Sequence, residues 1–213
     1  MRILITAGPT RERLDPVRFL SNESSGKMGF ALAVAAVQRG HDVRIVHGPV
    51  AIAPPAGIRA TAVVSAAEML AACERIWPRC DALIMAAAVA DYAPARVSKS
   101  KLKKSRAALT IRLIPTADVL TTLSASRRPG QIVMGFALED RAPRRNAAAK
   151  LRRKGLDAIV LNRPSAIGAD VSSVELLTRG GKWKRLSRSH KGRQAQRLVL
   201  ELERIWAGRD GAP

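Results

Sequence analysis

Short apolar runs alternate along the chain with longer amphipathic segments, a pattern typical of a parallel sheet covered by helices. Residues 3–5 form an apolar run that ends in a Gly-Pro turn signal, and residues 26–39 then carry apolar side chains at helical intervals. Gly40 follows as a C-cap, and residues 43–46 predict the next strand. The order strand, helix, strand predicts a βαβ unit with a right-handed crossover.

The same alternation continues and predicts one α/β, Rossmann-like domain over residues 1–213, with a mainly parallel sheet and helices on both faces. Residues 174–177 and 183–186 flank Gly180-Gly181 and predict a small β-hairpin extension. The sequence shows no internal repeat. The other expected strands are 62–64, 82–86, 109–114, 132–136 and 158–161, and the other expected helices are 66–76, 119–126, 146–154 and 194–206.

Two segments depart from this alternation of predicted strands and helices. Pro94 and the basic run at 99–104 predict a flexible lid over about residues 93–105. The chain ends in a basic tail, about residues 207–213, which we expect to fray.

The amino-acid composition restricts which residues form the core, and the net charge indicates a class of partner. Apolar residues make up 47% of the chain and aromatic residues 3%, so the core must consist of Ala, Leu, Val and Ile. The formal charge of +20 favours polyanionic partners without identifying them. Nucleotides, phosphorylated metabolites, nucleic acids and anionic membranes all stay open as partners, and genome composition is the alternative explanation for part of the arginine excess.

Cysteine and histidine usage favours neither a disulfide nor a metal site. Cys73 and Cys80 lie seven residues apart in a segment expected to be helical, which predicts two half-buried thiols on one face. The three histidines are scattered, so we expect no structural zinc and no metal held by side chains alone. The longest apolar stretch, 82–90, is too short to cross a bilayer, and the start lacks a signal peptide. We therefore expect a cytoplasmic protein without membrane contact.

The first predicted loop and helix carry a candidate anion site. Residues 24–29 bring two hydroxyls, an ammonium and free backbone N–H groups to the start of a helix. The segment is not a P-loop, since Leu20 stands where a glycine is required and Met28 follows Lys27, and an ordinary capped helix start is the alternative. Gly8-Pro9-Thr10 follows the first strand at the sheet edge where α/β proteins bind nucleotides, although such a dipeptide is more often only a turn.

Five motifs follow one another in fixed order along the chain. They are Thr6-Ala7-Gly8-Pro9-Thr10-Arg11-Glu12, Asp15-Pro16-Val17-Arg18-Phe19-Leu20-Ser21-Asn22, Ser24-Ser25-Gly26-Lys27-Met28-Gly29, Ala87-Ala88-Val89-Ala90-Asp91-Tyr92 and Lys101-Leu102-Lys103-Lys104. With these motifs the chain closely resembles the phosphopantothenate-cysteine ligase family, over residues 2 to about 174. In many bacteria this ligase is the C-terminal half of a bifunctional protein whose N-terminal half is a flavin-dependent decarboxylase. The resemblance therefore implies a stand-alone ligase without flavin, with the decarboxylase as a separate partner.

The resemblance implies a reaction in two steps. The carboxylate of 4'-phosphopantothenate attacks the α-phosphate of CTP and expels pyrophosphate, and the amine of L-cysteine then displaces CMP from the acyl-cytidylate. Cations and Mg²⁺ carried by the nucleotide shield the phosphate charge. No side-chain nucleophile is required, because the carboxylate and the amine of the substrates make the two attacks. The family also implies a homodimer and no specific nucleic acid.

The family's functional residues carry over position by position. Asn22 matches the asparagine that contacts the acyl group, where a neutral amide is able to donate to the carboxylate. Arg18 matches an arginine linked to the second half-reaction, and Lys101 matches a nucleotide-contacting lysine on a lid that excludes water. The implied substrate contacts are Asn22, Ala88 and Asp91, and the implied nucleotide contacts are Gly8, Ser24, Ser25, Gly26, Lys27, Ala87, Asp91, Lys101, Ala117, Asp118, Phe136, Lys150 and Lys154.

Two segments depart from the family pattern. Residues 116–119 lack the usual proline before Asp118, in a segment that cradles the base, so ATP stays open beside CTP. Residues 167–173 lack the asparagine that commonly follows Asp170, near the family's subunit contact.

Two other functions remain as alternatives. An NAD(P)-dependent short-chain reductase also carries Ser-Ser-Gly after its first strand, but it requires a Tyr-x-x-x-Lys pair, and the sole tyrosine, Tyr92, is followed by Arg96. A nucleic-acid-binding module would explain the charge, but the chain lacks aromatic residues interleaved with basic ones.

Overall fold

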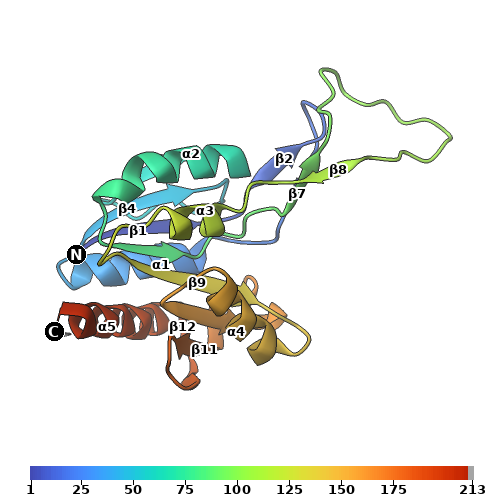
Figure 1. Ribbon diagram of the computed structural model, residues 1–213. Helices are drawn as coiled ribbons and strands as arrows, with labels where there is room; N and C mark the ends of the chain where they lie inside the picture. Colours follow the sequence, from blue (N-terminus) through green and yellow to red (C-terminus); the bar gives the residue numbers. More distant parts are fainter. Residues whose placement is uncertain (211–213) are drawn as a thin grey trace.

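An eight-stranded sheet forms the centre of the computed structural model, which describes residues 1–210 (Figure 1). Across the sheet the strand order is β12 (Lys184–His190), β11 (Val171–Thr178), β10 (Ala158–Asn162), β9 (Ile132–Leu138), β6 (Ala82–Met85), β1 (Arg2–Ala7), β4 (Asp42–His47) and β5 (Arg59–Ala62). Neighbouring strands from β10 to β5 run parallel, and β11 and β12 join antiparallel at one edge. The predicted Rossmann-like sheet with its hairpin extension is confirmed.

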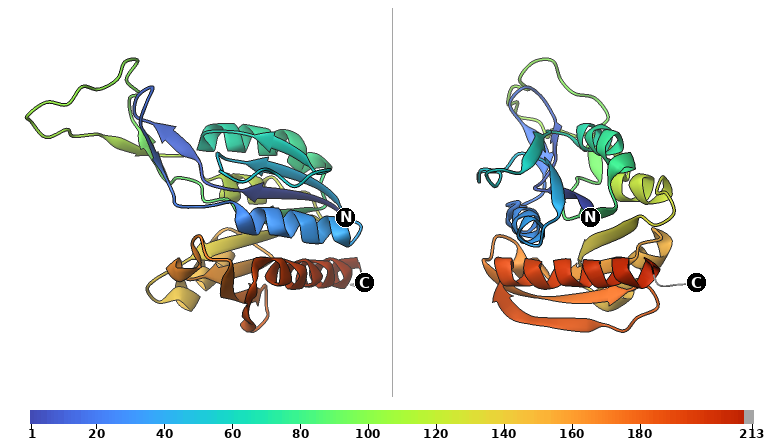
Figure 2. Two further views of the ribbon diagram at one scale, coloured as in Figure 1. Left: turned by 180° about the vertical axis from the view of Figure 1, so that it is seen from behind. Right: turned by 90° about the vertical axis from the view of Figure 1, so that its left-hand side faces the viewer.

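Helices cover both faces of this sheet. One face carries α1 (Lys27–Gln38) and α5 (Lys191–Asp210), which lie side by side (Figure 2). The other carries α2 (Ala66–Ile76), α3 (Val119–Ala125) and α4 (Pro143–Arg153). Two 3₁₀ turns, η1 (Trp77–Arg79) and η2 (Pro164–Ala166), complete the helical elements within residues 1–210.

The core consists of two layers because side chains alternate across each strand. Ile3 and Ile5 of β1 pack on the side of α1 and α5, whereas Leu4 between them packs on the side of α2. All three are at most 1% exposed, since a central parallel strand is covered on both faces. This explains why the first strand is a continuous apolar run in the sequence.

Three predicted segments differ from the structure. The strand expected at 62–64 lies earlier, at β5, whose residues are all exposed at the sheet edge. Of the strand expected at 109–114, only the short β8 (Leu113–Pro115) forms, outside the main sheet. The last helix continues to Asp210 through the first half of the tail expected to fray, while residues 211–213 lie outside the described part.

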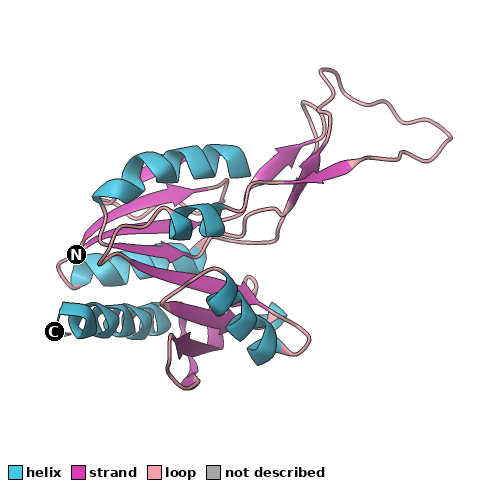
Figure 3. Ribbon diagram, in the orientation of Figure 1, coloured by secondary structure: helices cyan, strands magenta, loops and turns pink. Residues whose placement is uncertain are grey.

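Two small antiparallel pairs form an arm beyond the carboxyl ends of the parallel strands (Figure 3). β2 (Arg11–Arg13) pairs with β3 (Phe19–Ser21), and β7 (Tyr92–Pro94) pairs with β8. The segment between β7 and β8 contains the predicted lid. None of the helices within residues 1–210 combines the length and apolar character that a membrane span needs.

Candidate functional site

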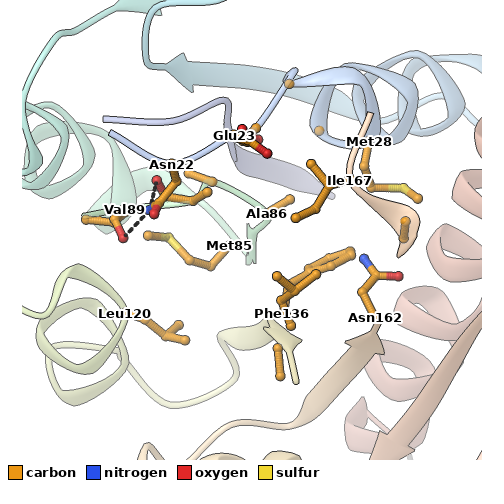
Figure 4. Close-up of a pocket in the computed structure, with 18 of the residues that line it drawn as sticks. Asn22, Glu23, Met28, Met85, Ala86, Val89, Leu120, Phe136, Asn162 and Ile167 are labelled. Atoms are coloured by element: carbon orange, nitrogen blue, oxygen red, sulfur yellow. Dashed lines mark hydrogen bonds between the residues drawn. The ribbon is translucent and has the colours of Figure 1, made fainter. Parts of the chain in front are cut away.

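A cavity of about 590 Å³ opens at the carboxyl ends of the parallel strands (Figure 4). It lies where the chain changes direction in the sheet, because β4 and β5 lie on one side of β1 whereas β6, β9 and β10 lie on the other. Open α/β sheets bind ligands at such a switch point. The cavity is lined by residues 22–29, 85–89, 91, 116–120, 136–138, 150, 154, 162, 166–168, 172 and 191.

Asn22 is held against the loop that follows β6. Its Nδ2 donates to the carbonyl oxygens of Ala88 and Val89, at 3.1 Å each (Figure 4). An amide nitrogen carries two hydrogens, so both donors are used within the protein. Only Oδ1 is left to accept a hydrogen bond from a ligand. Donation from this amide to a substrate carboxylate stays a prediction, and it would require Asn22 to release one of these two carbonyl oxygens.

The start of α1 is shaped by two glycines in the left-handed conformation. Gly26 has φ +75° and Gly8 has φ +73°. A Cβ on Gly26 would lie 2.8 Å from Cγ1 of Val50 and 3.6 Å from Cα of Gly8, so two loops touch at this point. Within the described residues, no side chain caps α1 and no acidic residue lies in its first turn. The free N–H groups and the positive end of the helix dipole thus face the cavity, as an anion site requires.

Two lysines of the α4 segment line the opposite wall. Lys150 Nζ donates to the carbonyl oxygen of Phe136 at 2.8 Å, and burial, followed by the charge of Lys154, lowers the pKa of Lys150. Lys154 Nζ lies 2.6 Å from a carboxylate oxygen of Asp118. Burial opposes ionisation of Asp118, but the hydrogen bonds from Lys154 and Thr121, together with the charge of Lys154, keep the Asp118 pKa below its ordinary value.

Lys27 and Lys191 bring positive charge to the near wall. Lys27 Nζ lies 2.7 Å from Oδ1 of Asp170, and this hydrogen bond lowers the pKa of Asp170. Lys191 Nζ donates to the carbonyl oxygens of Ala166 and Ala169. Burial, followed by repulsion from Lys27, lowers the pKa of Lys191. The lysines that line the cavity therefore all contact protein oxygens, which a ligand's phosphates would have to replace.

Most of the predicted site residues meet in this cavity, although they come from five separate segments. Gly8 lies beneath it, since its carbonyl oxygen accepts from Ala88 N at 2.9 Å and the loop that holds Gly26 packs against its backbone. The predicted residues that line the cavity are Asn22, Ser24, Ser25, Gly26, Lys27, Ala87, Ala88, Asp91, Ala117, Asp118, Phe136, Lys150 and Lys154.

Arg18 and Lys101 lie outside the cavity, on the arm. The guanidinium of Arg18 binds the buried carboxylate of Asp15 with Nε at 2.9 Å and Nη2 at 2.6 Å, and it also donates to Leu102 O. Leu102 N donates back to Asp15 at 3.1 Å, so Arg18 and Asp15 tie the first arm loop to the predicted lid beside Lys101. Burial opposes ionisation of Asp15, but hydrogen bonds from Val17, Arg18 and Leu102 hold its pKa well below the usual range.

The structure adds two residues to which we assigned no site role from the sequence. Asn162 lies at the end of β10, and its buried Oδ1 has no hydrogen-bond partner among the described residues. Figure 4 shows Asn162, Phe136 and Ile167 around one side of the cavity. A polar residue directly after a buried strand was the available signal for Asn162. Lys191 gives no such signal, because only the fold brings the start of the last helix to this wall.

Tyr92 and the two thiols do not contribute reactive groups to the cavity. Tyr92 belongs to β7 on the arm, is 54% exposed and does not line the cavity, so it does not take the position of the catalytic tyrosine of a short-chain reductase. Cys73 and Cys80 are both buried rather than half-buried. Burial raises the pKa of Cys73 to about 12 and that of Cys80 to about 11, which disfavours at neutral pH the thiolate that a nucleophilic cysteine requires.

Comparison with known proteins identifies similar sequences and structures. The family model described as "DNA/pantothenate metabolism flavoprotein C-terminal domain" matches residues 1–205. A Vibrio cholerae protein named "Coenzyme A biosynthesis bifunctional protein CoaBC" is 45% identical over 174 residues, which cover 81% of this chain and 44% of the relative. A protein from an unknown prokaryotic organism, named "Cysteine/Cysteine sulfinic acid decarboxylase", is 40% identical over 206 residues, which cover 94% of this chain and 57% of the relative.

A solved structure agrees with the sequence comparison. The crystal structure of the C-terminal domain of a coenzyme A biosynthesis bifunctional protein CoaBC superposes with a TM-score of 0.84 at 37% identity. The match covers 97% of this chain and 96% of that one. The chain thus spans about half the length of the curated relatives that it matches but nearly all of this separately solved domain.

Proposed function

Because the chain belongs to the family of the DNA/pantothenate metabolism flavoprotein C-terminal domain, we propose that it joins 4'-phosphopantothenate to L-cysteine in coenzyme A biosynthesis, with cleavage of a nucleoside triphosphate. The observation that carries this proposal is the cavity itself. It unites the α1 start, the loop after β6 and the α4 lysines in one space of a size suited to two small substrates.

The proposed reaction begins with the substrate carboxylate. One of its oxygens attacks the α-phosphate of the nucleotide, the new P–O bond replaces the bond to pyrophosphate, and an acyl-nucleotide results. The amine of cysteine then attacks the acyl carbon and the nucleoside monophosphate leaves as the amine loses a proton. Lysines 27, 150 and 154 supply positive charge where the phosphates gain negative charge, which is the contribution that phosphoryl and nucleotidyl transfer needs.

The two sides of the cavity suit different parts of these ligands. Phe136 offers a ring on which a base stacks, and the unpartnered Oδ1 of Asn162 offers an acceptor for an exocyclic amino group. Asn22 and Ala88 lie on the other side, where Oδ1 of Asn22 is available to accept from the cysteine amine. We therefore assign the base to the Phe136 side and the reacting groups to the Asn22 side.

CTP is the proposed nucleotide, with ATP as the alternative, since both carry an exocyclic amino group for Asn162. Within residues 1–210 no group of three or more His, Cys, Asp or Glu side chains is arranged to hold a metal. Asp91 lines the cavity, and we assign its carboxylate to assist a cation bound by the phosphates. Mg²⁺ carried by the nucleotide would neutralise part of the phosphate charge.

A homodimer is part of the proposal, and we infer that the arm adds a contact surface to the 167–173 segment, which lies near the family's subunit contact. Exposed apolar side chains collect on the arm, and burying them against a second copy would stabilise an assembly. Arg18 and Lys101 lie on the same arm outside their own cavity, so their proposed roles require a second copy or closure of the arm. Sedimentation velocity measures the oligomeric state: the wild type should sediment as a dimer, and Val97→Asp should shift it toward the monomer. The exposed apolar residues of the arm are Val17, Phe19, Tyr92, Val97, Leu109, Ile111, Leu113 and Ile114.

The remaining parts of the proposal concern the cellular setting. The charged, phosphorylated substrates favour action in the cytoplasm, and a flavin-dependent decarboxylase is the proposed partner that consumes the product. We do not propose decarboxylation by this chain itself, because the family model describes a C-terminal domain and the decarboxylase relative extends well beyond the match. The basic surface is not assigned a specific nucleic acid.

The decisive experiment supplies phosphopantothenate, cysteine and Mg²⁺ with CTP, ATP or UTP in separate reactions, and detects products by mass. Phosphopantothenoylcysteine should form together with the nucleoside monophosphate and pyrophosphate. Serine in place of cysteine serves as the control for amine selection. Absence of product with all three nucleotides, from protein with a cooperative unfolding transition, would contradict the proposal.

A further inference from the structure

The carboxylate of Asp170 contacts the ammonium of Lys27, which the proposed function assigns to the nucleotide phosphates. Its Oδ1 lies 2.7 Å from Nζ of Lys27. Lys27 begins α1 and lines the cavity, whereas Asp170 directly precedes β11. The two residues are 143 positions apart, so the fold alone creates this contact.

The ion pair is exposed enough to exchange partners. The side chain of Lys27 is 37% exposed and that of Asp170 is 70% exposed. An exposed ion pair contributes little net stability, and a phosphate offers more negative charge and more acceptor oxygens than one carboxylate. The hydrogen bond and charge of Lys27 lower the pKa of Asp170, so its carboxylate is ionised at neutral pH and occupies Lys27 as an anion would.

The backbone around Asp170 is anchored independently of this carboxylate. Lys191 N donates to the carbonyl oxygen of Asp170 at 3.0 Å, and Lys191 Nζ holds the carbonyl oxygens of Ala166 and Ala169. A substitution that removes the charge of Asp170 therefore leaves the segment held in place. The carboxylate is free to contribute to binding rather than to folding.

We propose that Asp170 is a built-in competitor of the nucleotide, which neutralises Lys27 while the cavity is empty and gives up this cation to a phosphate when the nucleotide binds. The inference rests on the proposed assignment of Lys27 to the phosphates. It makes Asp170 a residue that sets nucleotide affinity without taking part in bond making. It also gives a role to an aspartate whose side chain is mostly exposed but contacts a lysine of the cavity.

Calorimetric titration with Mg²⁺-CTP, and separately with Mg²⁺-ATP, tests this role in the absence of phosphopantothenate and cysteine. Asp170→Asn should bind about two- to fivefold more tightly than the wild type, the range that loss of an exposed ion pair implies. The gain should shrink at high ionic strength, because salt screens the competing pair.

Asp42→Asn is the matched control. Asp42 pairs with Arg59 at 2.9 Å, the two side chains are 50% and 63% exposed, and the pair lies near the amino end of β4, away from the cavity. The control removes the same charge and should leave the affinity unchanged. In a Lys27→Gln background, Asp170→Asn should no longer tighten binding, because the contested cation is gone.

Several results would overturn the inference. Weaker binding by Asp170→Asn would mean that the carboxylate itself holds the nucleotide or its Mg²⁺. An unchanged nucleotide affinity of Asp170→Asn, or the same gain in affinity in Asp42→Asn, would contradict the proposed competition for Lys27. If the wild type binds neither nucleotide, the proposed function fails together with the inference; if it binds and Asp170→Asn does not tighten binding, the inference alone fails.

Discussion

Nδ2 of Asn22 and the carbonyl oxygen of Ala88 are 3.1 Å apart, so the predicted substrate-binding amide is itself a brace for the loop that lines the site. We expect Asn22→Asp to lower kcat/KM by about 10²-fold or more, because a carboxylate cannot donate to this carbonyl or to that of Val89 and would repel both. Steady-state rates with all three substrates measure the loss.

Asn22→Ala is the control for this substitution. It also lacks the donors but adds no charge, so its loss should be smaller. Turnover at the wild-type level in Asn22→Asp would remove Asn22 from the mechanism.

Lys101→Gln should slow acyl-nucleotide formation about tenfold or more, because the proposed closure of the lid would bring this ammonium to the developing phosphate charge. Pyrophosphate release without cysteine isolates the first step. Lys99→Gln, on the same exposed segment, is the matched control and should release pyrophosphate normally. Equal losses of pyrophosphate release in the two variants would mean that Lys101 acts only as one of several surface charges.

The lowered pKa of Lys150 predicts a pH dependence of nucleotide binding. Below this pKa the ammonium is charged and affinity is constant; as pH rises through it, Lys150 loses its proton and affinity falls at a lower pH than an exposed lysine would cause. Lys154, Glu139, Asp118 and Asp91 also act on this group.

Dissociation constants from pH 7 upward check this dependence. Lys150→Arg should remove the early fall, since a guanidinium stays charged. Lys154→Arg retains Lys150 and should preserve it. An unaltered profile in Lys150→Arg would assign the titration to another group.

Gly26→Ala and Gly40→Ala separate backbone strain from steric collision. Both glycines have positive φ, so each substitution should cost about 1–2 kcal/mol of unfolding free energy. Only a Cβ at Gly26 meets Val50, whereas nothing lies within 4 Å of one at Gly40. Gly26→Ala should therefore lose more stability in urea unfolding and also weaken nucleotide binding. Equal losses without a binding defect would contradict the role of Gly26 in shaping the anion site.

Much of the fold could be predicted because its signals are local. The helix at 66–76 matches α2 residue for residue, since Ser65 caps its start and Pro78 follows its end. The strand predicted at 109–114 failed because its apolar alternation belongs to exposed arm residues, and only its last part finds a partner in β7. Alternation indicates two faces of a segment, but it does not say which surface one of them will meet.

The sequence by itself determined the α/β class, the family and the short segments that carry the site, because periodicity, turn residues and motif order are properties of near neighbours. The tertiary structure alone decided how those segments use their polar groups. In the folded protein, Nδ2 of Asn22 donates to the loop after β6, Arg18 pairs with Asp15, and Lys27 pairs with Asp170. Most of these contacts join residues far apart in the chain, and their geometry exists only once the sheet has brought its strand ends together.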